Sequence, residues 1–337
     1  MYKILRSYLF RRLLRTIGII IFVTFLTFFI IRLMPSNPID VYITNLVSIY
    51  GMSYEDAKAM AASLFSIDID KPIHEQFIDY FSNLLQGNLG ESYLSTGTPV
   101  IDMIGAFLPW TLFSVSLSLL TSFTLGIALG IISAYKRGSL IDNILTGLAS
   151  VLRAVPNYLL GLLILVFLGV QWNIWPVQYM RGAYSSGITP GFNLPFIVDV
   201  FKHVLAPFLT YVLSTFGTWM LAMKASTISV LGEDYVTVAK AKGLEERRIT
   251  FSYVGRNAML PLFTTLAISL GFIFGGSTLI ESVFIYRGVG LLLWRSINGR
   301  DYPVMQGVFL IITISVVVSN FLADLLYSLI DPRVRRR

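Results

Sequence analysis

Six long apolar stretches constrain the fold of this chain more than any other feature. They cover residues 13–34, 107–135, 144–171, 204–223, 258–284 and 304–330. Each is long enough to supply the ~20 apolar residues that a helix needs to cross a bilayer. Charged residues make up only 13% of the chain, against about 25% in soluble domains, which is too few to cover a water-facing surface. We therefore predict an all-α membrane protein with six transmembrane helices.

The first apolar stretch follows Arg11, Arg12 and Arg15, as the apolar part of a secretory signal peptide would. It ends near Pro35 without a small-x-small cleavage site. We therefore interpret residues 1–34 as an N-terminal arm and an uncleaved first transmembrane helix.

Lysine and arginine are unevenly distributed between the loops, and this asymmetry predicts the orientation. With the N-terminus in the cytoplasm, most of the 26 basic residues fall in the arm, in two cytoplasmic loops and in a basic tail over 332–337. An even number of crossings then places both termini of this multi-pass cell-membrane protein in the cytoplasm. We interpret the basic residues behind the net charge of +7 as topology determinants. We therefore expect the protein to contact a lipid bilayer and not to bind nucleic acid.

Residues 35–105 form a long acidic segment on the extracytoplasmic side. The pattern predicts one short helix over Tyr54–Phe65, with Ser53 as N-cap, and another over Pro72–Leu85 with an apolar face. We expect a small extracytoplasmic helical insertion that is either a solvated cap or a docking surface for an extracellular partner. Residues 106–331 would then form the five-helix membrane core.

The cytoplasmic loop 224–257 predicts a helix, a sharp turn and a second helix. Acidic Glu233 and Asp234 would begin the first helix, and Lys240 and Lys242 would end it, which matches the helix dipole at both ends. Gly243 follows, at the position that favours a left-handed backbone. We therefore expect Gly243 to have a positive φ angle.

This first helix carries four apolar residues on a loop that faces water: Tyr235, Val236, Val238 and Ala239. A helix of about ten residues is marginal by itself, so it should pack against something. Two alternatives stay open from the residues: its own helix ends, or a groove in a cytoplasmic partner.

The sequence shows no catalytic or metal-binding constellation. Cysteine is absent, His74 and His203 have no ligand spacing around them, and no Ser-His-Asp set stands out. A Gly-Lys-Ser/Thr phosphate-binding loop is also missing. We predict a protein that is not an enzyme and binds no cofactor directly, and any ATP-driven process would need a separate ATPase.

Several separated motifs resemble the permeases of ABC importers, and within them the dipeptide/oligopeptide permease family. The cytoplasmic loop carries Glu233-Asp234-Tyr235-Val236, Ala239-Lys240-Ala241-Lys242-Gly243-Leu244 and Arg256-Asn257-Ala258-Met259-Leu260-Pro261. Elsewhere the chain carries Gly87-Asn88-Leu89-Gly90-Glu91-Ser92, Glu281-Ser282-Val283-Phe284, Arg300-Asp301-Tyr302-Pro303 and Asp331-Pro332-Arg333. The broad signature begins Glu-Ala-Ala where this chain has Thr237-Val238-Ala239, so no role of that Glu is transferred to Thr237.

The resemblance implies a second, homologous but different permease subunit, two cytoplasmic ABC ATPases and an extracytoplasmic substrate-binding protein. It implies a coupling helix in the ATPase groove, with these contact residues: Glu233, Asp234, Tyr235, Val236, Val238, Ala239, Lys240, Ala241, Lys242, Gly243 and Leu244. The cargo it implies is peptides, with oligosaccharides or another small solute as the alternative. A secondary transporter ranks lower, because the charges lie near the ends of the apolar stretches.

Three glycines in the fifth apolar stretch, Gly271, Gly275 and Gly276, give a small-xxx-small pattern. They favour either close packing within the subunit or a permease–permease seam beside the translocation path.

Overall fold

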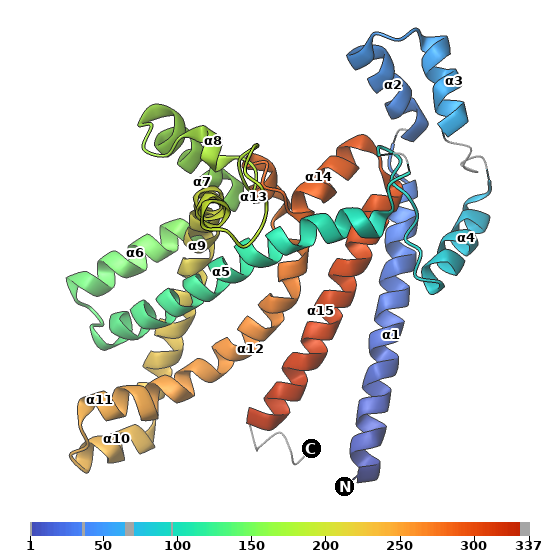
Figure 1. The fold of residues 1–337 in the computed structure, drawn as a ribbon. Coiled ribbons are helices and arrows are strands. Elements are labelled where there is room, and N and C mark those ends of the chain that lie inside the picture. Colours follow the sequence, from blue (N-terminus) through green and yellow to red (C-terminus); the bar gives the residue numbers. More distant parts are fainter. Residues whose placement is uncertain (1, 36–37, 65–70, 96, 331–337) are drawn as a thin grey trace. The chain divides into compact units, whose positions relative to one another are not determined.

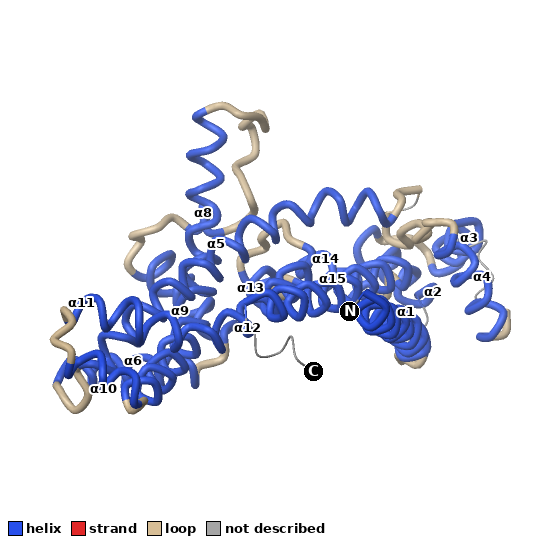
Figure 2. Tube along the Cα trace, turned by 90° about the horizontal axis from the view of Figure 1, so that it is seen from below, coloured by secondary structure: helices blue, strands red, loops and turns tan. Residues whose placement is uncertain are grey.

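The computed structural model describes residues 2–35, 38–64, 71–95 and 97–330, and this part of the chain consists of helices joined by loops (Figures 1 and 2). Its β-structure consists of one isolated bridge between Glu91 and Pro99. The prediction of an all-α protein is therefore confirmed for the described residues. The predicted basic tail, 332–337, lies outside them.

The chain divides into two compact units. Unit 1 contains residues 1–111, 274–278 and 287–321, and unit 2 contains residues 112–273, 279–286 and 322–337. Two long helices, α5 (Val100–Tyr135) and α15 (Tyr302–Ile330), contribute to both.

Unit 1 combines α1 and several short helices with parts of the long helices α5 and α15. Besides parts of α5 and α15 it contains α1 (Tyr2–Arg32), α2 (Pro38–Tyr50), α3 (Tyr54–Leu64), α4 (Ile73–Leu85), α14 (Val289–Gly299) and part of the 3₁₀ turn η3 (Ile273–Gly275). Its largest core cluster joins Val100 and Ile104 of α5 to Leu292 of α14 and Val308 of α15. The predicted helices of the insertion are confirmed as α3 and α4, and the Ser53 hydroxyl accepts a hydrogen bond from the Asp56 amide at 3.2 Å.

Unit 2 contains the middle of the chain. Its elements are α6 (Leu140–Ala154), α7 (Asn157–Ile164), the π-helix η1 (Leu165–Gln171), α8 (Val177–Met180), α9 (Leu194–Leu231), α10 (Asp234–Ala241), α11 (Glu246–Arg248), the π-helix η2 (Ile249–Gly255), α12 (Arg256–Phe272) and α13 (Thr278–Val283). Its core centres on Trp219 of α9, whose ring meets Phe123 of α5 edge to face at 5.1 Å. Helix α9 is the central element, because α5, α6, α7 and α12 all pack against it.

Four helices in the described part are long and apolar enough to cross a bilayer: Leu14–Arg32, Val100–Tyr135, Leu194–Leu231 and Tyr302–Phe321. The predicted helix over 144–171 is instead two helices bent by 101°. Pro156 explains the break, since the residue before a proline avoids helical geometry and Val155 is extended at φ −78°, ψ 127°. Counting this bent pair as one span gives five.

The predicted helix over 258–284 is also interrupted. Helix α12 ends at Phe272, and Gly276 follows with φ +60°. At its other end, α12 continues from α11 (Glu246–Arg248) and η2 (Ile249–Gly255) without a break. By length and composition the described residues supply four such helices, or five with the bent pair, so the six predicted transmembrane helices are not confirmed.

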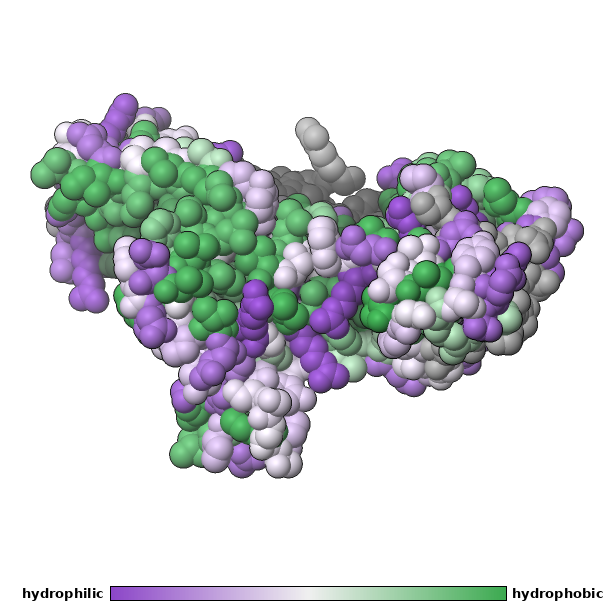
Figure 3. Space-filling view, turned by 90° about the horizontal axis from the view of Figure 1, so that it is seen from above, coloured by the Kyte–Doolittle hydropathy of each residue, from purple (hydrophilic) through white to green (hydrophobic). Residues whose placement is uncertain are grey.

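Much of the outer surface is apolar, as a lipid-facing surface requires. Figure 3 shows hydrophobic side chains gathered into broad areas with hydrophilic residues at their margins. On α6 the exposed side chains Leu140, Ile144, Leu148 and Val151 recur at helical spacing.

Candidate functional site

The predicted cytoplasmic loop forms a short helix, α10, followed by a glycine turn. Asp234 lies in the first turn and Lys240 in the last, as the dipole favours. Gly243 has φ +70°, and its amide donates to the Lys240 carbonyl at 2.9 Å. The predicted positive φ is confirmed, and it is a conformation that side chains other than glycine rarely adopt.

One face of α10 is buried within its own unit. Val236 and Ala239 are 0% and 3% exposed and pack with Ile249 and Val254 of η2 and with Tyr135 at the end of α5. The alternative of packing against its own chain therefore holds for this face. As the helix stands, Val236 and Ala239 offer no surface to another protein.

The opposite face of α10 is open. Tyr235 and Val238 are 40% and 51% exposed, and the predicted contact residues Glu233, Asp234, Lys240, Ala241, Lys242 and Gly243 are exposed as well, with Leu244 partly buried. Partial burial raises the pKa of the Tyr235 hydroxyl, the Glu233 carboxylate adds to the effect, and a hydrogen bond with Asn257 opposes it. The Tyr235 hydroxyl is thus neutral near pH 7.

The predicted second helix begins as the three-residue α11 and continues as η2 before α12. Gly255 ends the π-turn, where a Cβ atom would lie 2.9 Å from the Thr250 carbonyl oxygen. Phe251 on this turn is 64% exposed beside the loop. The sequence did not predict this π-turn or the exposed position of Phe251 on it, because a regular helical period gives no sign of the extra residue in a π-turn.

The three predicted seam glycines do not share one helix face, because α12 ends between them. Gly271 is buried in the last turn of α12, and Gly276 lies in the following turn. Gly275 faces its own subunit: a Cβ there would lie 3.4 Å from Ile312 of α15.

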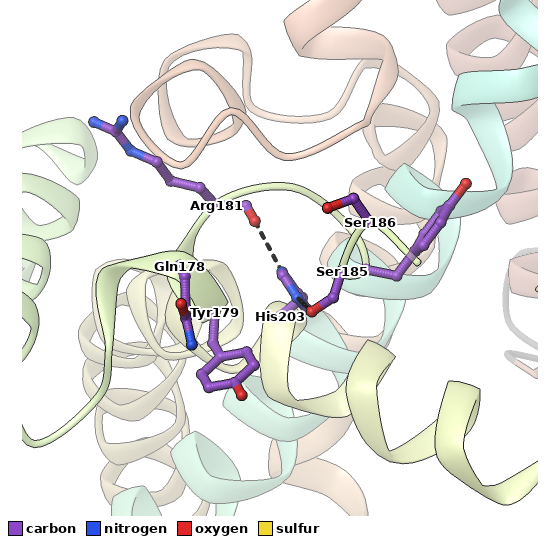
Figure 4. Close-up of a pocket in the computed structure, with 7 residues that line it drawn as sticks. Gln178, Tyr179, Arg181, Ser185, Ser186 and His203 are labelled. Carbon is purple, nitrogen blue, oxygen red and sulfur yellow. Dashed lines mark hydrogen bonds between the residues drawn. The ribbon is translucent and has the colours of Figure 1, made fainter. Parts of the chain in front are cut away.

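A polar cavity lies where the loop after α8 meets α9 (Figure 4). Its volume is about 510 Å³, and its lining residues are Gln178, Tyr179, Arg181, Tyr184, Ser185, Ser186 and His203. The Ser185 hydroxyl lies 3.0 Å from His203 Nε2 and 2.9 Å from Asp199 Oδ1. This Ser-His-Asp set was missed by sequence reasoning, although Asp199 and His203 are one helical turn apart.

The geometry of this set differs from that of a catalytic triad. A triad needs the carboxylate on the far nitrogen of the imidazole, but His203 Nδ1 donates to the Arg181 carbonyl at 2.8 Å. Asp199 instead accepts from Ser185, including its backbone amide at 2.6 Å. The side chain of Arg181 points away from His203 in Figure 4. The set therefore ties the loop after α8 to α9 rather than activating a nucleophile.

Metal binding has no support among the described residues, where no group of three or more His, Cys, Asp or Glu side chains could hold an ion.

Residues 126–336 match the family described as binding-protein-dependent transport system inner membrane component. The chain belongs to this family, whose members are membrane permease subunits of transporters and not enzymes. The family and the apolar helices agree on a multi-pass protein of the inner membrane.

Similar proteins match over nearly their full length. The di/tripeptide transport system permease protein DppB of Pseudomonas aeruginosa (strain UCBPP-PA14) is 33% identical, over 98% of this chain and 99% of the relative. The oligopeptide transport system permease protein AppB of Bacillus subtilis (strain 168) is 30% identical over 97% and 99%. The dipeptide transport system permease protein DppB of Escherichia coli (strain K12) is 29% identical over 98% and 99%.

Proposed function

We propose that this chain is a permease subunit of an ATP-driven peptide importer. With a second, homologous permease it would form the translocation path for peptides that an extracytoplasmic binding protein delivers. The names of the similar permeases from three bacteria support the peptide cargo. The observation that carries the coupling role is α10, a helix held by its own chain on one face and open on the other.

In this proposal the open face of α10 contacts the groove of a cytoplasmic ABC ATPase. Tyr235 and Val238 supply the apolar contact, and Glu233, Asp234, Lys240 and Lys242 surround it with charge. Val236 and Ala239 act indirectly, because their burial against Tyr135, Ile249 and Val254 links α10 to α5 and η2. A push on α10 is then passed to the membrane helices, which alternate between inward-facing and outward-facing states.

The proposed topology has six crossings with both termini in the cytoplasm. The bent pair α6–α7 supplies one crossing, and α12 with the short elements after it supplies another, alongside the four continuous helices. Broken helices at membrane depth are tolerated where protein surrounds them. The acidic insertion within 35–105 then lies outside, where it would receive the binding protein.

Cysteine cross-linking tests the coupling contact in the assembled transporter. Because the chain contains no cysteine, a single Val238→Cys variant needs no background changes. We expect it to cross-link to cysteines placed along the ATPase groove. Val236→Cys is the matched control two residues away, which should stay unlinked because it is buried. Absence of any cross-link from Val238 to the groove would contradict the proposal.

Reconstitution tests the transport function. Proteoliposomes with both permeases and both ATPases should accumulate labelled dipeptide only with ATP and the binding protein. Uptake by this chain alone, driven by an ion gradient, would refute an ATP-driven importer.

A further inference from the structure

A buried ion pair connects three helices of unit 2 at the end nearest α10. Lys224 of α9 places its ammonium 2.5 Å from Asp142 Oδ1 and 2.8 Å from the Thr146 hydroxyl, both on α6. The Asp142 carboxylate also accepts from the Ser133 hydroxyl of α5 and from the Gly138 amide at 3.0 Å. One carboxylate therefore holds α5, the turn after it, α6 and α9 together.

Both side chains of this ion pair are largely buried. Asp142 is 4% exposed, and the Lys224 side chain is 17% exposed. A charge buried to this degree is tolerated only when it is paired and hydrogen-bonded. Removing one partner leaves the other as an uncompensated buried charge.

Close backbone packing surrounds the ion pair and makes the three helices stiff. A Cβ atom at Gly130 of α5 would lie 2.7 Å from the Met220 carbonyl oxygen of α9. A Cβ atom at Gly217 of α9 would lie 2.2 Å from the Ala149 carbonyl oxygen of α6. The Gly217 contact lies two helical turns from Lys224 along α9 and two turns from Asp142 along α6, so the ion pair is what holds the ends of these helices.

The same helix ends rest on the buried face of α10. Tyr135, at the end of α5, and Leu231, at the end of α9, both pack on the cluster that contains Val236. The turn that leads into α6 begins directly after Tyr135. A displacement of α10 therefore reaches α5 and α9 first, and it reaches α6 through the shared carboxylate.

We propose that Asp142 and Lys224 form a latch that makes the ends of α5, α6 and α9 move together when α10 is pushed. They are positioning residues for the coupling of ATP hydrolysis to transport, and this role rests on the function proposed above. Without the latch, α10 would move α5 and α9 while α6 lagged behind, and hydrolysis would continue with little transport.

The test uses the complete transporter in proteoliposomes with its binding protein. Lys224→Met should leave assembly and basal ATP hydrolysis intact, lower peptide uptake by about tenfold and lower the peptide moved per ATP. The exposed Lys136 on the adjacent turn supplies the control Lys136→Met, which should transport like the wild type. Lys224→Arg keeps the positive charge beside Asp142 and should restore most of the peptide-per-ATP ratio.

A second readout follows the helices directly. Spin labels at exposed Leu140 of α6 and Ser229 of α9 should give one narrow distance distribution through the ATP cycle in the wild type. The distribution should broaden in Lys224→Met, which a purely folding-related defect in an assembled transporter would not produce.

Several outcomes decide the matter. Wild-type uptake or an unbroadened distribution in Lys224→Met would overturn the latch. If Lys224→Met does not assemble, the neutral pair Asp142→Asn with Lys224→Gln decides in its place: an assembled complex with a low peptide-per-ATP ratio supports the latch, and a normal ratio or loss of assembly overturns it. Failure of the wild-type complex to couple ATP to uptake would instead refute the proposed function.

Discussion

Single residues decide how the turn after α10 and the loop before α5 are held. Gly243 supplies a left-handed turn at the end of α10, where its φ is +70° and a Cβ would meet no atom within 4 Å. The demand at this position is therefore conformational rather than steric. Asp301 has a different role, since its carboxylate satisfies three donors of the loop before α5.

Gly243→Val should impair coupling while leaving membrane insertion intact. A β-branched residue in a left-handed conformation costs about 1–2 kcal/mol, so the turn would relax and tilt α10. We expect lower uptake per ATP in reconstituted transporter, with Gly243→Asn less affected because asparagine tolerates this region. Unchanged uptake in the valine variant would speak against a rigid turn.

Asp301→Ala should lower the thermal stability of the purified subunit. Asp301 is 1% exposed and accepts from the Ser92 hydroxyl at 2.5 Å and from the amides of Tyr93 and Leu94. Losing these bonds costs about 2–3 kcal/mol, and Asp301→Asn, which keeps one acceptor oxygen, should cost less. The check is the unfolding midpoint, and equal midpoints for all three proteins would contradict this role.

At the scale of elements, α9 organises unit 2 because glycines let its neighbours approach closely. Gly217 faces the Ala149 carbonyl oxygen of α6, and Gly126 of α5 faces the backbone around Trp219, where a Cβ would lie 2.4 Å from the Trp219 Cβ. These contacts bring α6 and α5 close to the same stretch of α9.

Gly217→Ala should therefore destabilise the subunit by about 1–3 kcal/mol, because the added methyl group forces α6 away from α9. Gly147→Ala, on the facing helix α6, is the matched control, since nothing lies within 4 Å of its Cβ position. Alanine is also the better helix former, so the control should be neutral or slightly stabilising. Resistance to trypsin during heating reports both, and equal resistance of the two variants would disprove the close contact.

The elements also show what the sequence could predict. The apolar stretches of the sequence predicted where every long helix lies. The charged residues and the glycine around α10 predicted its two ends to within a residue. The bend at Pro156 and the break after Phe272 were not predictable from apolar length, because hydropathy does not distinguish a continuous helix from a broken one. Val236 and Ala239 resemble partner contacts in sequence, and only the fold reveals that they face inward.

At the scale of the whole molecule, motifs far apart in the sequence serve common contacts. The Ser92 motif and the Asp301 motif meet in one hydrogen-bonded cluster within unit 1. Asp142 and Lys224 meet likewise in unit 2. No spacing rule relates such distant pairs, which is why the Asp142–Lys224 ion pair was not foreseen.

The acidic insertion gives a prediction at this scale. Replacing exposed Glu55, Glu75 and Asp79 by their amides should raise the concentration of binding protein that gives half-maximal uptake by about tenfold at low salt. The difference should shrink at high salt, where screening weakens the wild type too. Ser82→Ala, exposed on the same helix as Asp79, serves as control. An unaltered uptake curve at low salt would favour the solvated-cap interpretation.

The inward face of α10 has one more consequence. A synthetic fragment covering residues 233–244 would lack the supporting side chains of Tyr135, Ile249 and Val254, and so short a peptide is mostly unfolded in water. We expect it to compete poorly with α10 for binding to the ATPases, even though it carries every outward-facing side chain. A hydrocarbon staple across the inward positions would replace the missing scaffold, and such a peptide should block the transporter from the cytoplasmic side.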